Sequence, residues 1–143
     1  EEAFLSYITE RYNIKGKDVA AGKCKYYLND LSFKNFLYPG FAYGVGYLLE
    51  NAVYLELRRL GYIVYTGSFR DKEVDFVAMK DDRVIYLQAT YMLETAQTME
   101  REYAPLLTIG DNYEKYVVSM DEVQFPSNEG VRHIQAWNLK EIL

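Results

Sequence analysis

The stretch GYLLENAVYLEL, residues 46–57, decides how the rest of the chain is interpreted. Its apolar residues recur at helical spacing, so the sequence predicts a helix over residues 47–60. On a helical wheel, Glu50 falls between Leu57 and Tyr54, inside the apolar stripe. A carboxylate in that position is costly unless something neutralises it, which makes Glu50 the first candidate functional residue.

The strand predicted over residues 73–79 carries a second acid among apolar neighbours. Simple alternation places Glu73, Asp75 and Val77 on one face of this strand and Phe76 on the other. Such a pattern is typical of a well-buried strand, so Asp75 is the second candidate.

The strand predicted next, over residues 84–91, places Gln88 and Thr90 on one face. A helix Glu, a strand Asp and this polar pair can converge at one point. Two carboxylates, an amide oxygen and a backbone carbonyl form an oxygen-rich pocket that suits Mg²⁺ or Mn²⁺. Glu50, Asp75 and Gln88 are therefore the candidate metal ligands.

A structural interpretation of the two acids stays open beside the metal site. Glu50 could pair with Arg58 or Lys72 as a salt-bridged core residue, and Asp75 could accept hydrogen bonds from backbone amides.

The remaining pattern predicts a mixed α/β domain built around one sheet. From residue 47 onward the expected order is helix, three strands, helix, strand, strand. Besides the segments above, we expect a helix over 2–12, a loop over 13–22, a strand over 23–28, helical turns over 31–37, a strand over 62–66, a helix over 95–107, and strands over 116–120 and 131–139.

Composition fits one ordinary globular domain of 143 residues, with 50% hydrophobic and 26% charged residues. The net charge of −5 argues against a strongly basic nucleic-acid coat, and the hydrophobic content argues against a disordered chain. Cys24 is the one cysteine, which excludes a disulfide scaffold and favours a cytoplasmic protein. No apolar run approaches the ~20 residues of a membrane helix, so no membrane partner is expected.

Charge is unevenly distributed along the chain. Residues 1–72 carry ten Lys and Arg against eight Asp and Glu, whereas residues 73–143 carry six against thirteen. If a polyanion binds, the first half would meet it, and the alternative is that these are solvated loop charges. The candidate nucleic-acid-binding residues are Lys15, Lys17, Lys23, Lys25, Arg58 and Arg59.

Two familiar motifs fail on inspection. The run Gly22-Lys23-Cys24 has Lys17 where a phosphate loop needs its first Gly, and Cys24 replaces the Ser or Thr that holds magnesium. His133 is the single His, so a structural zinc site is excluded, and we expect His133 to be a packed or surface residue.

The order of Glu in a helix, Asp in a strand and Gln-x-Thr in the next strand resembles the PD-(D/E)xK, or restriction-endonuclease-like, superfamily. More closely, KYYLNDL at 25–31, the stretch at 46–57 and EVDFV at 73–77 are similar to an uncharacterised C-terminal domain. That domain follows the ATP-hydrolysing domain in many prokaryotic AAA-type ATPases, and the resemblance covers about residues 25–120.

The resemblance implies a restriction-endonuclease-like mixed central sheet flanked by helices, in a single domain over 1–143. Residues 1–24 would then be the end of the segment that joins it to an upstream ATPase domain, and ATP would bind only in that upstream domain. A start inside the helix expected over 2–12 fits this arrangement.

The resemblance also assigns roles to the candidate residues. It carries Glu50 and Asp75 onto the metal-binding acids of the superfamily, with Mg²⁺ or Mn²⁺ as the ion, and Gln88 onto its second acid or the frequent Gln replacement. Thr90 falls where the catalytic Lys is expected. Thr cannot stabilise charge on a phosphate as that Lys does, so we expect a degenerate catalytic site.

Three functions remain open at this point. The leading one is a C-terminal accessory domain of an AAA-type ATP-binding protein, inactive as a nuclease and used for DNA or protein binding and regulation. The second is an active Mg²⁺-dependent DNA endonuclease. The third is a protein-interaction or dimerisation module, a possible homo-oligomer, favoured by the 15 Tyr residues. The rings that could line an interface are Tyr43, Tyr47, Tyr62, Tyr65, Tyr86 and Tyr91.

Overall fold

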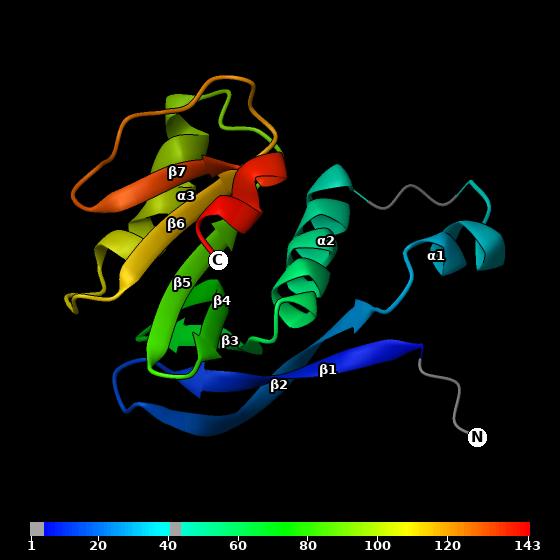
Figure 1. Ribbon diagram of the computed structural model, residues 1–143, viewed down its shortest axis with the longest axis horizontal. Helices are drawn as coiled ribbons and strands as arrows, with labels where there is room; N and C mark the ends of the chain where they lie inside the picture. Colours follow the sequence, from blue (N-terminus) through cyan, green and yellow to red (C-terminus); the bar gives the residue numbers. More distant parts are fainter. Residues whose placement is uncertain (1–4, 41–43) are drawn as a thin grey trace.

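The computed structural model of the chain describes residues 5–40 and 44–143, and its centre is one mixed sheet with helices on both faces (Figure 1). The sheet has seven strands in the order β2-β1-β3-β4-β5-β6-β7. The strands are β1 (Ser6–Asn13), β2 (Asp18–Leu28), β3 (Ile63–Phe69), β4 (Lys72–Lys80), β5 (Arg83–Ala89), β6 (Glu114–Ser119) and β7 (Val131–Gln135). The helices are α1 (Ser32–Leu37), α2 (Val45–Arg59), α3 (Ala96–Leu107) and the 3₁₀ helix η1 (Ala136–Glu141).

Antiparallel and parallel pairings divide the sheet. Strands β3, β4 and β5 form an antiparallel meander, and β5, β6 and β7 run parallel. Strand β1 is parallel to β3 and antiparallel to β2. The expected mixed α/β class with helices flanking one sheet is confirmed.

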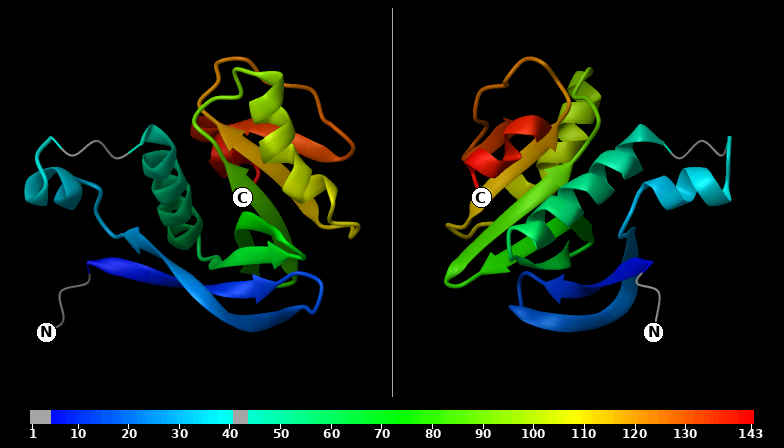
Figure 2. Two further views of the ribbon diagram at one scale, coloured as in Figure 1. Left: turned by 180° about the vertical axis from the view of Figure 1, so that it is seen from behind. Right: turned by 45° about the vertical axis from the view of Figure 1, so that its right-hand side comes forward.

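Helices α2 and α3 cover opposite faces of the sheet, as the right-hand view of Figure 2 shows. Leu57 of α2 packs in a core with Phe76 and Leu87, while Leu106 of α3 packs in a second core with Val77 and Tyr86. Alternate residues of β4 and β5 therefore serve two separate cores, which explains their nearly continuous apolar sequence. Among the described residues, no helix is long and apolar enough to cross a membrane.

The N-terminal region corrects the sequence prediction. The helix expected over 2–12 is wrong, because residues 6–13 form β1; the first three residues of that expected helix lie outside the described part. Tyr7, Ile8, Thr9 and Tyr12 are β-branched or aromatic, and pairing with strands on both sides outweighs the helical spacing of the apolar residues.

Two further boundaries differ from expectation. The loop expected over 13–22 is wrong from Asp18 onward, since β2 already begins there after a short turn. The last strand ends at Gln135 rather than Leu139, because the chain turns into η1 and buries Leu139 against the α2 core.

The β1–β2 hairpin is bent, and the bend brings an edge strand toward the middle of the molecule. Thr9 pairs with Lys25 and Arg11 pairs with Ala20, so a single residue of β1 faces residues 21–24 of β2. Beyond this slip the end of β2 packs beneath α2, where the ring of Tyr27 stacks on Tyr54 with 4.2 Å between centroids.

Candidate functional site

A bulge in β4 turns Asp75 toward α2. Tyr65 pairs with Val77 and Gly67 pairs with Val74, so Asp75 and Phe76 together face a single residue of β3. Strict alternation, which placed Val77 on the face of Asp75, is therefore wrong: Phe76 packs in the α2 core and Val77 in the α3 core.

Gly67 makes this bulge possible. A Cβ at this position would lie 2.9 Å from Cγ2 of Val77 and 3.0 Å from Cβ of Val74. No larger residue fits without moving β4, so the sequence Thr66-Gly67 shapes the site although neither residue belongs to it.

Glu50 and Asp75 meet on the ammonium group of Lys25. Nζ of Lys25 lies 2.9 Å from Oε1 of Glu50 and 3.2 Å from Oδ1 of Asp75. Glu73 contributes a third carboxylate, with Oε1 at 3.0 Å from the same nitrogen. Three acids from α2 and β4 thus surround one lysine from β2; we call these four residues the lysine-centred cluster.

Two further residues donate hydrogen bonds to these acids, and only one of them, Arg11, adds a positive charge. The Tyr27 hydroxyl donates to Oε1 of Glu50 at 2.7 Å, and the Arg11 guanidinium donates to Oε2 of Glu73 at 2.8 Å. The side chains of Glu50 and Asp75 are 14% and 12% exposed, whereas that of Glu73 is 40% exposed. The two inner acids therefore depend on Lys25 for compensation far more than Glu73 does.

Titration behaviour follows from this geometry. Burial, then the negative charge of Glu50, raises the pKa of Asp75 to about 6 against the opposing effect of Lys25. Burial opposes the charge on Lys25, but the carboxylates of Asp75 and Glu50 outweigh it, so the pKa of Lys25 is raised. Burial raises the pKa of Glu73, and hydrogen bonds from Lys25 and Arg11 overcome it to give a net lowering.

Gln88 supports the cluster from the opposite face of the sheet. Its Oε1 accepts a hydrogen bond from the backbone N–H of Asp75 at 3.2 Å, and its Nε2 faces Oε2 of Glu102 on α3 at 3.3 Å. The second oxygen of Asp75, Oδ2, accepts from the Ala89 N–H at 3.0 Å. Asp75 and Gln88 thus hold β4 and β5 together just beyond their last ladder pair.

Thr90 follows the end of β5 and is buried, and its backbone N–H donates to the Val118 carbonyl at 3.0 Å. That bond extends the pairing of β5 with β6. The structure therefore brings Glu50 and Asp75 together, places Gln88 against the backbone of Asp75, and uses the Thr90 backbone to join two strands.

The arrangement as it stands does not fit a divalent cation. Oxygens of Glu50, Glu73 and Asp75 all point at an ammonium nitrogen, which fills the position that a shared ion would need. Within residues 5–40 and 44–143, no three His, Cys, Asp or Glu side chains are grouped so as to hold a metal ion.

The chain is related to a longer protein. An uncharacterized protein of Haemophilus influenzae is 34% identical to it over 119 residues, which is 83% of this chain and 29% of that relative. The chain therefore spans less than a third of the length of this curated relative. No family model matches the chain. No solved structure matches it either.

The basic candidates for nucleic-acid binding have different environments. Lys25 is held in the lysine-centred cluster, Arg59 forms an ion pair with Glu56 at 2.6 Å, and the Arg58 guanidinium lies over the ring of Tyr7 at 5.6 Å. Two others lie in or beside the β1–β2 turn: Lys15 is exposed, and Nζ of Lys17 lies 6.0 Å from the Tyr113 ring. Lys23 is exposed on β2.

Sequence reasoning named Lys25 only as a candidate for nucleic-acid binding, and it missed Tyr27 and Glu73 as site residues. The partner of Glu50 is Lys25, in place of the Arg58 or Lys72 that the structural interpretation suggested. The signal available was that Lys25 and Tyr27 share one face of the strand predicted over 23–28. Strand parity alone could not show that the hairpin bends under α2.

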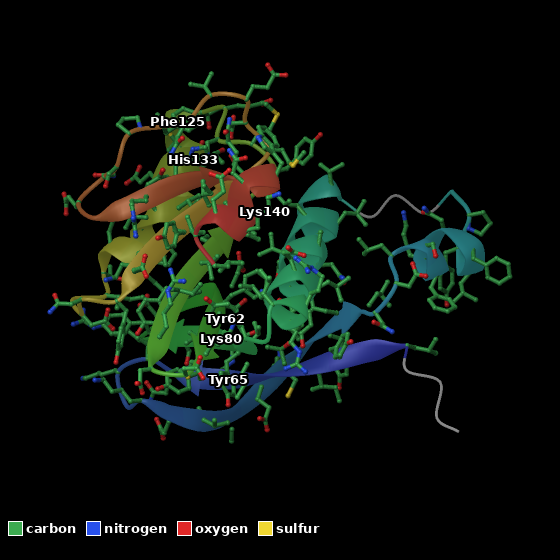
Figure 3. The ribbon with its side chains drawn as sticks, in the orientation of Figure 1. Tyr62, Tyr65, Lys80, Phe125, His133 and Lys140 are labelled. Atoms are coloured by element: carbon green, nitrogen blue, oxygen red, sulfur yellow. The ribbon has the colours of Figure 1, made fainter. Side chains whose placement is uncertain are left out.

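His133 is a packed residue, one of the two placements expected for it. Its Nδ1 accepts from the Phe125 N–H at 3.1 Å, so the ring hydrogen lies on Nε2 and points to Oγ of Ser119 at 2.8 Å. Ser119 in turn donates to Oδ2 of Asp121 at 2.6 Å. Burial lowers the pKa of His133. Figure 3 shows His133 and Phe125 at the β6–β7 end of the molecule.

Proposed function

We propose that this chain is a C-terminal accessory domain of an AAA-type ATP-binding protein, with a restriction-endonuclease-like fold whose nuclease-like site is inactive. Three observations support the proposal: the helix acid and the strand acid that meet at one point, the mixed sheet with a helix on each face, and a relative more than three times longer than the aligned segment. In this proposal the protein is cytoplasmic and ATP binds only to the upstream domain.

The observation that carries the proposal is the position of Lys25. For a metal ion to bind between Glu50 and Asp75, both carboxylates would have to give up an ion pair that compensates their burial. Thr90 adds no positive charge where a phosphoryl transition state would need one. Lys25, the cation beside Glu50 and Asp75, therefore occupies the place that a water-activating metal ion would need, and Thr90 supplies no second positive charge for the transition state at phosphorus.

The same contacts give the cluster a structural role. Lys25 ties the bent end of β2 to α2 and β4, which belong to different parts of the sequence. The domain would then act by binding DNA or protein rather than by cutting.

Incubation with supercoiled plasmid and linear duplex DNA in Mg²⁺ and in Mn²⁺ tests the proposal. We expect no turnover above that of the Asp75→Ala variant, because the unmodified site already holds the Lys25 ammonium group in place of a metal ion. Cleavage that Asp75→Ala abolishes would contradict the inactive assignment.

DNA binding is a separate arm of that experiment. Fluorescence anisotropy with a duplex at 50 and 200 mM salt distinguishes the two binding roles, since phosphate contacts weaken steeply with salt. Salt-sensitive binding that the triple variant Lys15→Ala, Lys17→Ala and Lys23→Ala weakens would assign DNA as the partner. Binding absent at both salt concentrations would assign protein as the partner.

One observation favours the alternative of an active Mg²⁺-dependent endonuclease. Lys25 brings an amine beside Glu50 and Asp75, and this amine could supply the positive charge that Thr90 lacks. In that case the cleavage assay would show turnover in the unmodified chain, and Lys25→Met and Asp75→Ala would each abolish it.

A further inference from the structure

An apolar groove lies between α2 and the segment that joins β2 to α1. It has a volume of about 370 Å³, and Lys25 and Glu50 are among the residues that line it. Most of its walls are apolar or aromatic, formed by Tyr26, Leu31, Tyr47 and Leu48. Tyr26 and Tyr47 are 68% and 70% exposed, so the groove faces solvent rather than the core.

An exposed apolar protrusion lies next to this groove; it is formed by Phe36 and Leu37 of α1, and we call it the α1 knob. Helix α1 buries none of its residues, and it stands away from the sheet at one end of the molecule (Figure 1). Phe36 is 82% exposed, more than any other large apolar side chain among the described residues, and Leu37 is 58% exposed. A short apolar helix with no buried face gains its stability from a surface that covers it.

The exposed area is that of a stable protein interface. Taking ~200 Å² for each large side chain, the apolar residues of this region expose on the order of 800 Å², which is what each partner contributes to a standard-size interface. These residues are Tyr26, Phe33, Phe36, Leu37, Tyr38, Val45 and Tyr47. Of the rings expected at an interface, Tyr47 lies here, Tyr62 and Tyr86 are buried, Tyr65 is half-buried, Tyr91 is exposed elsewhere, and Tyr43 lies outside the described residues.

Charge on this surface favours a second copy of the chain over a polyanion. Residues 26–48 contain one acid, Asp30, and one base, Lys34, so the segment is neutral in a chain of net charge −5. The groove is also lined by Lys25 and Glu50, which form an ion pair with each other and leave the surface neutral. Nucleic acids are held by clustered Lys and Arg, which this segment lacks. Two copies can meet here without the like-charge repulsion that other surfaces of an acidic chain would impose.

We propose that two copies assemble about a two-fold axis, with Phe36 and Leu37 of each copy seated in the Tyr26–Tyr47 groove of the other. A two-fold interface brings each patch against its own counterpart, so a knob and a groove must lie side by side on the same surface. The α1 knob and the adjoining groove meet that requirement. This dimer goes beyond the proposed function and does not depend on the nuclease-like site.

Sedimentation equilibrium between 1 and 100 μM tests the interface. The unmodified chain is expected to be dimeric in this range, and Phe36→Asp should raise the dissociation constant at least ~30-fold, as the loss of a central apolar contact does. Val123→Asp is the matched control: Val123 is 67% exposed between β6 and β7, and its replacement should leave the dimer unchanged. Circular dichroism should show the same helix and strand content in all three proteins.

A mixing experiment tests the reciprocal geometry. Tyr47→Arg damages the groove but leaves the knob, so it should be monomeric alone, as should Phe36→Asp. An equimolar mixture should dimerise again, because one intact knob enters one intact groove and the introduced Asp meets the introduced Arg. Asp75→Ala should remain dimeric, which separates this interface from the nuclease-like site. A monomeric unmodified chain at 100 μM, a dimer that neither variant weakens, or a mixture that stays monomeric would each overturn the proposal.

Discussion

Two polar clusters lie in different parts of this fold, and they are stabilised in different ways. The lysine-centred cluster gathers charges from β2, α2 and β4 around one ammonium nitrogen. The second cluster, Ser119, Asp121 and His133, is a chain of hydrogen bonds between the end of β6 and the middle of β7.

The difference lies in how much depends on one residue. If Lys25 is removed, Glu50 and Asp75 lose the cation that compensates them, and the pKa of Asp75 rises further. In the hydrogen-bonded cluster, Asp121 also accepts from the Leu93 N–H at 2.9 Å, and His133 also accepts from the Phe125 N–H. In the lysine-centred cluster Glu50 and Asp75 also have second partners, the Tyr27 hydroxyl and the Ala89 N–H, but both of these partners are neutral. The compensating positive charge is therefore concentrated on Lys25, whereas the second cluster distributes its hydrogen bonds over several partners.

Lys25→Met should cause the largest loss. Methionine keeps most of the side-chain volume but leaves two largely buried carboxylates uncompensated, so we expect about 3 kcal/mol less free energy of unfolding at pH 7. Urea denaturation measures it. The control is Lys140→Met on an exposed lysine of η1, with a change under about 0.5 kcal/mol.

A second replacement sharpens this result. Adding Glu50→Gln to Lys25→Met removes one of the uncompensated charges, so the double variant should recover part of the lost stability. If Lys25→Met lowered the free energy of unfolding no more than Lys140→Met does, Lys25 would not compensate the buried acids. The proposed difference between the two clusters would then be wrong.

Ser119→Ala should have a smaller effect. It removes the hydroxyl that links His133 to Asp121, and each of these keeps a second partner, so we expect a loss of about 2 kcal/mol. Ser127→Ala is the control. Ser127 lies on an exposed loop, and its hydroxyl donates to the Val131 carbonyl. A loss from Ser119→Ala as large as that from Lys25→Met would contradict the difference between the clusters.

The two clusters should respond to pH in opposite directions between pH 7 and pH 5, and the contribution of Asp75 should change by about 1 kcal/mol over this range. The raised pKa of Asp75, about 6, gives a stabilising contribution that is full below pH 4 and is lost as pH rises through 6. The lowered pKa of His133 gives a contribution that is present above pH 6.5 and is lost as pH falls below it.

Variants separate these two contributions. Relative to the unmodified chain, Asp75→Asn should be more destabilised at pH 5 than at pH 7, and His133→Gln less destabilised at pH 5 than at pH 7. Urea denaturation of all three proteins at both pH values measures the effect, and equal pH responses in the two variants would argue against these pKa shifts.

The comparison also shows what could be predicted from the sequence. The helix at 47–60 and the two acids were recognised because their pattern is local: Glu50 interrupts an apolar stripe, and Asp75 interrupts an apolar strand. The partner of these acids was not recognised, because Lys25 reaches them through a register slip in the hairpin and a bulge in β4. Both irregularities depend on close packing between distant segments, which strand alternation cannot represent.

The N-terminal strand teaches the same point. Phe4, Leu5, Tyr7 and Ile8 have a spacing in the sequence that a helix also satisfies, and only the pairing of residues 6–13 with β2 and β3 decides for a strand. The network around Ser119 and Asp121 was missed for another reason: each is a common polar residue near a strand end, with no sequence feature that links it to His133.

Calorimetric titration with Mn²⁺ tests the central claim, that Lys25 takes the position of a metal ion between Glu50 and Asp75. We expect no saturable binding to the unmodified chain at millimolar Mn²⁺, binding to Lys25→Met, and loss of that binding when Asp75→Asn is added. Saturable binding to the unmodified chain that Asp75→Asn abolishes would contradict it.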